Sequence, residues 1–176
     1  MSRQRRIVAG FAAASISALA LVGVPMTAAQ AAAPQCSNAD LHATFHHTDA
    51  AAGHRFGRLV LTNVSHHACH TGGYGGLSYV GHGNGTQIGD PAARRPGTTL
   101  RSFVLHRGQS ASSLVQIANA DNYAKRACHP TKVDGFRVYV PNSHVSQFMP
   151  YRTVGCARSL GRLGPQLSHQ ALRKLH

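Results

Sequence analysis

The sequence predicts an all-β protein: an antiparallel immunoglobulin-like β-sandwich with two disulfides, preceded by a signal peptide. Three observations favour this fold. Short runs of alternating apolar and polar residues recur along the chain, separated by turn-forming residues. The chain has 18 Gly and 8 Pro but no Glu, whereas surface helices usually carry Glu and Lys on their solvent face. Four cysteines follow an apolar N-terminal segment, which is typical of a stapled domain in an oxidising compartment.

The first 31 residues have the pattern of a secretory signal peptide. A basic head precedes an apolar run over 7–24, and the small-residue site Ala29-Gln30-Ala31 follows. A retained membrane anchor is the alternative interpretation. We expect residues 32–163 to form the domain, with no transmembrane segment after signal cleavage. Residues 164–176 are expected to be a basic tail, either disordered or a short amphipathic helix.

Alternation and turn signals place the strands. A tight hairpin is expected at Asn84-Gly85, a surface loop over 90–99, and irregular structure over 119–131. The first strand is expected to end in a turn-rich segment over 48–53. The predicted strands are 41–45, 56–63, 77–80, 86–88, 100–105, 111–118, 136–140, 145–149 and a short last strand at 160–163.

The four cysteines allow three pairings, and the hairpins favour one of them. Cys36 precedes the first strand and Cys69 follows the second, so an antiparallel hairpin makes them neighbours. Cys128 and Cys156 flank a later strand pair in the same way. We therefore predict disulfides from Cys36 to Cys69 and from Cys128 to Cys156. Because each disulfide closes a loop, the chain-entropy relation predicts that each stabilises the fold by about 3 to 4 kcal/mol.

The order of several elements resembles a known family. These elements are Cys36, Leu-Val-Leu-Thr-Asn at 59–63, Cys69, Gly-Tyr-Gly-Gly-Leu at 73–77, Cys128 and Phe-Arg-Val-Tyr-Val-Pro at 136–141. Together they resemble the domain of unknown function 4232 family. The resemblance implies an exported actinobacterial β-sandwich with no established activity or catalytic residues. This chain departs from the family in having no lipidation box, in its many histidines and in having Gly75 where Pro is common. It is therefore expected to be secreted, either released or loosely associated with the cell wall.

Thirteen histidines follow the signal peptide, and the densest group is His66, His67 and His70. Neutral imidazole is a good ligand for zinc or copper, so a His-mediated metal-binding protein is one hypothesis. The alternative is that these are exposed turn residues. Their spacing matches no closed metal site, and the prediction includes no cofactor.

Enzyme classes find little support in the sequence. The segment around Cys156 resembles the nucleophile motif of cell-wall cysteine enzymes, but Val154 stands where those enzymes have His. A nucleophilic cysteine also needs a free thiolate, and Cys128 is a ready disulfide partner. Five Asp and no Glu leave few carboxylate pairs for glycoside hydrolysis. We predict no enzymatic activity.

Charge gives the remaining functional signal. The chain has 18 Lys and Arg against 5 acidic residues, a formal net charge of +13. Such a surface attracts anionic cell-envelope polymers, or it serves solubility alone. No nucleic-acid partner is expected, because Trp is absent and no binding motif is present. Two glycosylation-like patterns, at 63–65 and 84–86, are interpreted as coincidence. The predicted function is an exported, non-catalytic binding or structural module.

Overall fold

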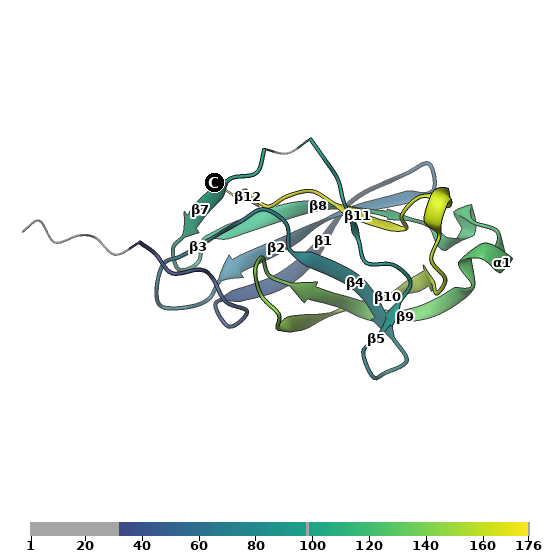
Figure 1. Cartoon of the computed structure of the whole chain (residues 1–176), viewed down its shortest axis with the longest axis horizontal. Coiled ribbons are helices and arrows are strands. Elements are labelled where there is room, and N and C mark those ends of the chain that lie inside the picture. The colour runs from purple at the N-terminus through teal and green to yellow at the C-terminus, as the bar shows by residue number, and fades with distance from the viewer. Residues whose placement is uncertain (1–31, 98, 176) are drawn as a thin grey trace, which may run out of the picture. The chain divides into compact units, whose positions relative to one another are not determined.

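The structure, a computed structural model, describes residues 32–97 and 99–175, so the expected signal peptide lies outside it. Most of its regular structure is β-strand, in two larger sheets and one two-stranded pair (Figure 1). No helix in this described part is long and apolar enough to cross a membrane. The secondary structure is all-β, as the sequence predicts.

The larger sheet has six strands. Five follow the spatial order β1-β2-β8-β11-β6, and β12 also pairs with β8. Since β2 pairs along all of β8 on one side, β11 and β12 follow one another along its other edge. The bounds are β1 Leu41–Ala51, β2 His54–Asn63, β6 Ala93–Arg94, β8 Ser110–Ala118, β11 Leu167–His169 and β12 Arg173–Lys174.

The second sheet has the order β10-β9-β4-β5, and a small separate sheet pairs β3 with β7. Three short helical elements complete the described chain. The strand bounds are β3 Cys69–Gly72, β4 Gly76–Gly81, β5 Thr86–Ile88, β7 Ser102–Leu105, β9 Pro130–Tyr139 and β10 Ser146–Cys156. The helical bounds are η1 Ala120–Asn122, α1 Lys125–Cys128 and η2 Gly161–Leu163.

The two larger sheets pack face to face around one core. Phe136 of β9 is fully buried and lies at the centre of an aromatic cluster. Its ring centroid is 5.2 Å from Phe45 of β1, 5.1 Å from Tyr79 of β4 and 4.7 Å from Tyr151 of β10. These contacts join both sheets, because β1 belongs to the larger sheet and the other three strands to the second. Burying so many large rings supplies much of the hydrophobic stabilisation.

The predicted hairpins are present, with one difference at the first turn. β1 and β2 pair antiparallel from Leu41 opposite Asn63 to Ala51 opposite His54. The sequence predicts a turn over 48–53, but a bulge between His47 and Asp49 allows pairing to continue to Ala51. The turn itself is made by Ala52 and Gly53, with φ angles of 45° and 77°. The β4–β5 hairpin and the β9–β10 pair follow the prediction.

The C-terminal segment, residues 164–176, differs from the tail that the sequence predicts. It is neither helical nor disordered over its described residues, because β11 and β12 pair with β8 there. Leu167 and Leu172 lie in the main core, at 1% and 3% exposure. The sequence misleads here because these leucines fit a helical spacing, whereas the edge of β8 needs a backbone partner.

Two smaller features also differ from the prediction. Leu160 to Leu163 was expected to be a strand but forms a 3-10 turn, closed by a hydrogen bond from Leu163 N to Leu160 O. The larger sheet is not wholly antiparallel. Strand β6, which lies within the expected surface loop over 90–99, pairs parallel with β11. The β6 strand has no local sequence signal, since its pairing depends on where the C-terminal segment lies.

Candidate functional site

The Cys36–Cys69 disulfide joins the entry of β1 to the start of β3, with the two Cα atoms 4.9 Å apart. Both cysteines are buried. The backbones are also bonded, because Cys36 N donates to His70 O at 2.9 Å and His70 N donates to Pro34 O at 2.8 Å. This is the pairing that the hairpin argument predicts. It fixes the turn that carries the three candidate metal-binding histidines.

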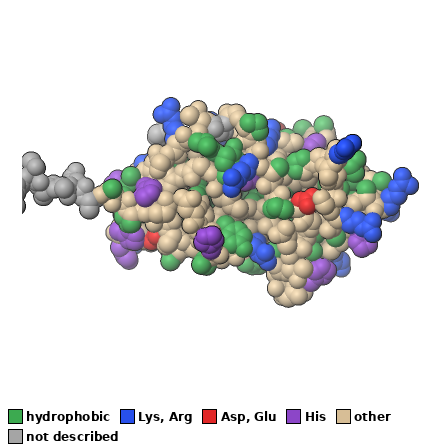
Figure 2. Space-filling view, viewed as in Figure 1, with side chains coloured by type: hydrophobic (Ala, Val, Ile, Leu, Met, Phe, Trp, Pro, Cys, Tyr) green, Lys and Arg blue, Asp and Glu red, His purple; other side chains and the backbone are tan. Residues whose placement is uncertain are grey.

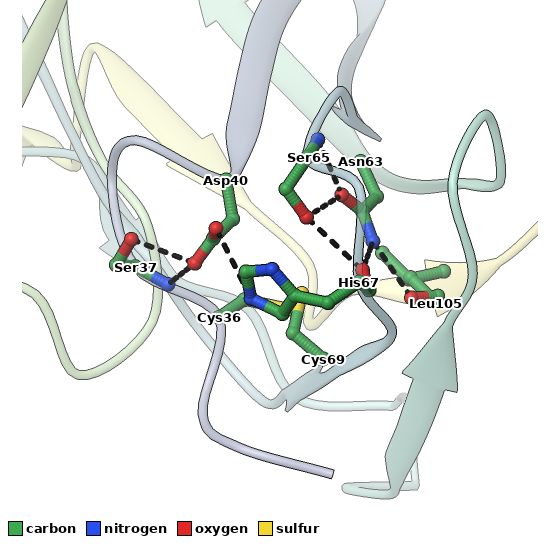
Figure 3. Close-up of polar contacts among 8 residues, drawn as sticks. All are labelled: Cys36, Ser37, Asp40, Asn63, Ser65, His67, Cys69 and Leu105. Atoms are coloured by element: carbon green, nitrogen blue, oxygen red, sulfur yellow. Dashed lines mark hydrogen bonds and ion pairs between the residues drawn. A yellow bond between two sulfur atoms is a disulfide. The ribbon is translucent and has the colours of Figure 1, made fainter.

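Asn63 organises the same turn from inside (Figure 3). Its side chain is fully buried, and its amide donates to His67 O at 2.9 Å and Leu105 O at 2.8 Å. Its carbonyl oxygen accepts from Ser65 N at 2.9 Å and Ser65 Oγ at 2.7 Å. The amide therefore uses both donor hydrogens and both acceptor positions. It ties the end of β2 to β7 and to the histidine turn.

Asp40 holds the other side of this turn (Figure 3). Its Oδ2 accepts from Ser37 N and Ser37 Oγ, each at 2.7 Å, and its Oδ1 lies 3.4 Å from His67 Nε2. The hydrogen bonds from Ser37 hold the pKa of Asp40 below its usual range, and His67 adds a smaller electrostatic effect. Because the His67 side chain is 54% exposed, this ion pair adds little stability.

The three candidate histidines do not form a common site. His66 Nδ1 lies 2.9 Å from Arg107 Nη1, and His70 Nδ1 lies 2.6 Å from Ala33 O, while His67 contacts Asp40. In residues 32–97 and 99–175 there is no group of three or more His, Cys, Asp or Glu side chains that could hold a metal ion. The metal-binding hypothesis therefore gains no support from the geometry.

The second disulfide occupies the candidate cysteine nucleophile. Cys128 bonds to Cys156 with the Cα atoms 4.4 Å apart, and none of the four cysteines is free. Both residues lie in a small second core with Ala120 and Leu160. A thiolate at Cys156 is therefore absent from this fold, and with it the nucleophile that a cysteine enzyme needs.

A buried Ser-His pair has no counterpart among the features that the sequence predicts, because the prediction places His169 in the tail. His169 of β11 is 2% exposed, and its Nδ1 lies 3.3 Å from Ser113 Oγ on β8. Ser113 Oγ donates to Gln170 O at 2.5 Å, and the ring of Tyr74 packs edge-on against the imidazole. The strand that carries His169 has only three residues, so no alternation marks it in the sequence. Because both members are buried, the pair is a structural contact of the core.

The environment of His169 makes an acid-sensitive element. Burial lowers its pKa, and the nearby guanidinium of Arg94 lowers it further. The unfolded chain therefore binds a proton at His169 more readily than the folded chain does. It follows that the contribution of His169 to the free energy of unfolding is fully present above the unfolded pKa of about 6.5. This contribution is lost as the pH drops below that value.

We expect the free energy of unfolding to decrease between pH 7.5 and 5, and part of that decrease to disappear in His169→Gln. Urea titrations at several pH values measure it. Asp40, whose pKa is also lowered, contributes separately, because its effect is lost only as the pH falls below about 3.8. An identical pH slope in the wild type and in His169→Gln above pH 5 would contradict the assignment.

Both glycosylation-like patterns have a structural explanation. In each, the Asn carbonyl oxygen accepts from the backbone N–H and the hydroxyl of the residue two positions later. Asn84 makes this turn with Thr86 at 3.0 and 2.7 Å, as Asn63 does with Ser65. The Asn-x-Ser/Thr pattern is thus a turn motif here. The Asn63 amide nitrogen is also buried and donates two hydrogen bonds, so a glycosylating enzyme has no access to it.

The fold and these contacts define a class: an all-β domain held by two disulfides, with no free thiol. The chain belongs to the family described as Domain of unknown function (DUF4232), whose pattern matches residues 36–168. The match ends inside β11, so the family pattern reaches the start of the C-terminal segment and stops before β12. No curated protein and no solved structure matches the chain.

Proposed function

We propose that this chain is an exported, non-catalytic immunoglobulin-like β-sandwich that binds anionic polymers at the cell envelope or outside the cell. Export is supported by the pattern of residues 1–31 and by the two disulfides, which persist in oxidising compartments. The sandwich is supported by two sheets that share one core. The absence of catalysis is supported by the oxidised cysteines and the buried Ser-His pair.

The observation that carries the binding proposal is the way the acidic residues are used. Beyond residue 31 there are fifteen Lys and Arg but only five Asp. Four of those carboxylates accept hydrogen bonds from backbone N–H or hydroxyl groups: Asp40, Asp49, Asp90 and Asp134. The single ion pair among the described residues joins Asp40 to His67, so no described Lys or Arg has a carboxylate within 4.0 Å.

The positive charge therefore remains open to solvent and to ligands. Figure 2 shows basic side chains spread over the visible face, with acidic ones scarce. An excess of unneutralised guanidinium and ammonium groups raises the local concentration of anionic polymers and speeds their association.

Salt dependence tests this proposal. The mature chain is expected to be retained on a resin carrying an anionic envelope polymer at about 0.1 M salt and released at about 1 M, because the Debye length falls from roughly 10 to 3 Å. A neutral polysaccharide resin is the control and should retain nothing. Absence of retention, or retention that salt does not change, would contradict electrostatic binding.

A further inference from the structure

A groove crosses the outer face of the six-stranded sheet where β12 pairs with β8. Its volume is about 880 Å³, and it is lined by residues from four separate segments of the chain. Arg58 of β2 lies opposite Leu114 of β8, and Arg173 of β12 lies opposite Ser112. The segment before β7 adds Arg101. Figure 1 shows β7 and β12 close to β8 at this end of the sheet.

The charges that line this groove are of one sign. Arg58, Arg101, Arg173 and Lys174 line it, and no Asp does. The three arginines are exposed, and none of them donates a hydrogen bond to another described side chain or carbonyl, whereas Lys174 Nζ donates to Val104 O at 2.8 Å. Elsewhere, arginines such as Arg55 and Arg95 are bonded to neutral partners. Like charges gathered without a counter-charge favour an anion in the space between them.

The same groove has apolar walls. Phe103 and Leu114 are half-buried in its lining, and Leu175 is 40% exposed beside them. Ser112 and Ser102 also line it, and the Ser102 hydroxyl makes a long hydrogen bond of 3.5 Å to Thr71 O. The lining therefore offers guanidinium groups next to carbon surface. A ligand that alternates anionic oxygens with short carbon linkers matches both features, whereas a compact inorganic anion leaves the apolar walls unused.

We propose that this groove binds a phosphodiester polymer of the polyol-phosphate kind. A guanidinium pairs its two parallel N–H groups with two oxygens of a phosphate. Each phosphodiester of the polymer presents two such oxygens, and its polyol linkers lie against the apolar walls. Arginines on three different segments contact successive phosphates along the strand. This inference rests on the proposed function, since it assigns that binding to one place and one ligand chemistry.

Two triple variants with the same change in charge test the site. The groove variant is Arg58→Gln, Arg101→Gln and Arg173→Gln. The control variant is Arg126→Gln, Arg152→Gln and Arg162→Gln, three exposed arginines outside the groove. The probe is fluorescent poly(glycerol phosphate), and affinity is measured by anisotropy at about 0.1 M salt. The groove variant is expected to bind at least tenfold more weakly than the wild type, and the control about twofold more weakly.

Circular dichroism melting checks that both variants fold, and a second groove variant with Lys at the three positions keeps the charge but removes the guanidinium fork. That variant should bind with intermediate affinity. Equal losses in the groove and control variants would overturn the groove while leaving the proposed function intact. Tighter binding of polyglutamate than of poly(glycerol phosphate) would overturn the phosphodiester assignment. A wild-type chain that binds neither polymer would overturn the proposed function itself.

Discussion

Replacing Cys36 and Cys69 together with Ala is expected to lower the free energy of unfolding by about 3 to 4 kcal/mol. The disulfide spans 33 residues of sequence, so its loss frees a long loop in the unfolded chain. Both cysteines are buried, so replacing them brings little favourable solvation to offset this loss of stability. Since small domains are stable by only about 5 to 15 kcal/mol, the variant should be marginal at 37 °C. Urea unfolding of the two forms measures the difference.

The second disulfide provides the comparison for this experiment. Cys128 and Cys156 are 28 residues apart, so their removal is expected to have nearly the same effect. The two effects should add, because the bridges lie in different clusters of the core. A loss below about 1 kcal/mol for either pair would show that the chain-entropy account does not apply to that bridge.

Replacing Asn63 with Ala should lower the free energy of unfolding by about 3 kcal/mol. The change removes four hydrogen bonds, all of them from a fully buried side chain, including the one to the carbonyl of Leu105. Each such bond contributes about 1 kcal/mol, and an unsatisfied buried group costs about 1 to 3 kcal/mol. Urea unfolding and hydrogen exchange at the β2–β7 end of the fold report the effect.

Asn84→Ala is the matched control for this substitution. Asn84 makes the same turn with Thr86, but it is exposed and reaches no second strand. Water replaces the lost bonds there, so we expect a change of about 0.5 kcal/mol or less. Similar losses at the two positions would show that the buried bonds of Asn63 do not set its contribution.

Local signals in the sequence were sufficient for much of the fold. The β1–β2 and β9–β10 pairs could be predicted because alternation and turn residues lie within one stretch of chain. The disulfide pairing followed from the same hairpins, since each hairpin brings its two flanking cysteines together. Alternation within a strand and a nearby turn are properties that a single sequence displays.

Long-range pairing was not predictable in the same way. β11 pairs with Ile117 through Val115, about fifty residues earlier in the chain, and its three residues are too few to show a period. The parallel pair of β6 with β11 depends in turn on that contact. The sequence therefore predicts a tail here, whereas the segment is paired and His169 is buried.

The candidate site shows the same limit. His66, His67 and His70 are close in sequence, but their rings contact three different partners. Proximity along a turn thus did not produce a common site. Arg58 and Arg173 line one groove although 115 positions of sequence separate them. No spacing rule relates residues that a sheet brings together from distant strands.

The placement of β11 and β12 has a consequence for how the protein is made. A chain that emerges N-terminus first from a ribosome or a membrane channel exposes these strands after all the others. Until they emerge, one edge of β8 has no partner and the site of Leu167 and Leu172 in the core stays empty. The β8 edge and the core therefore become complete only after residues 167–174 have emerged.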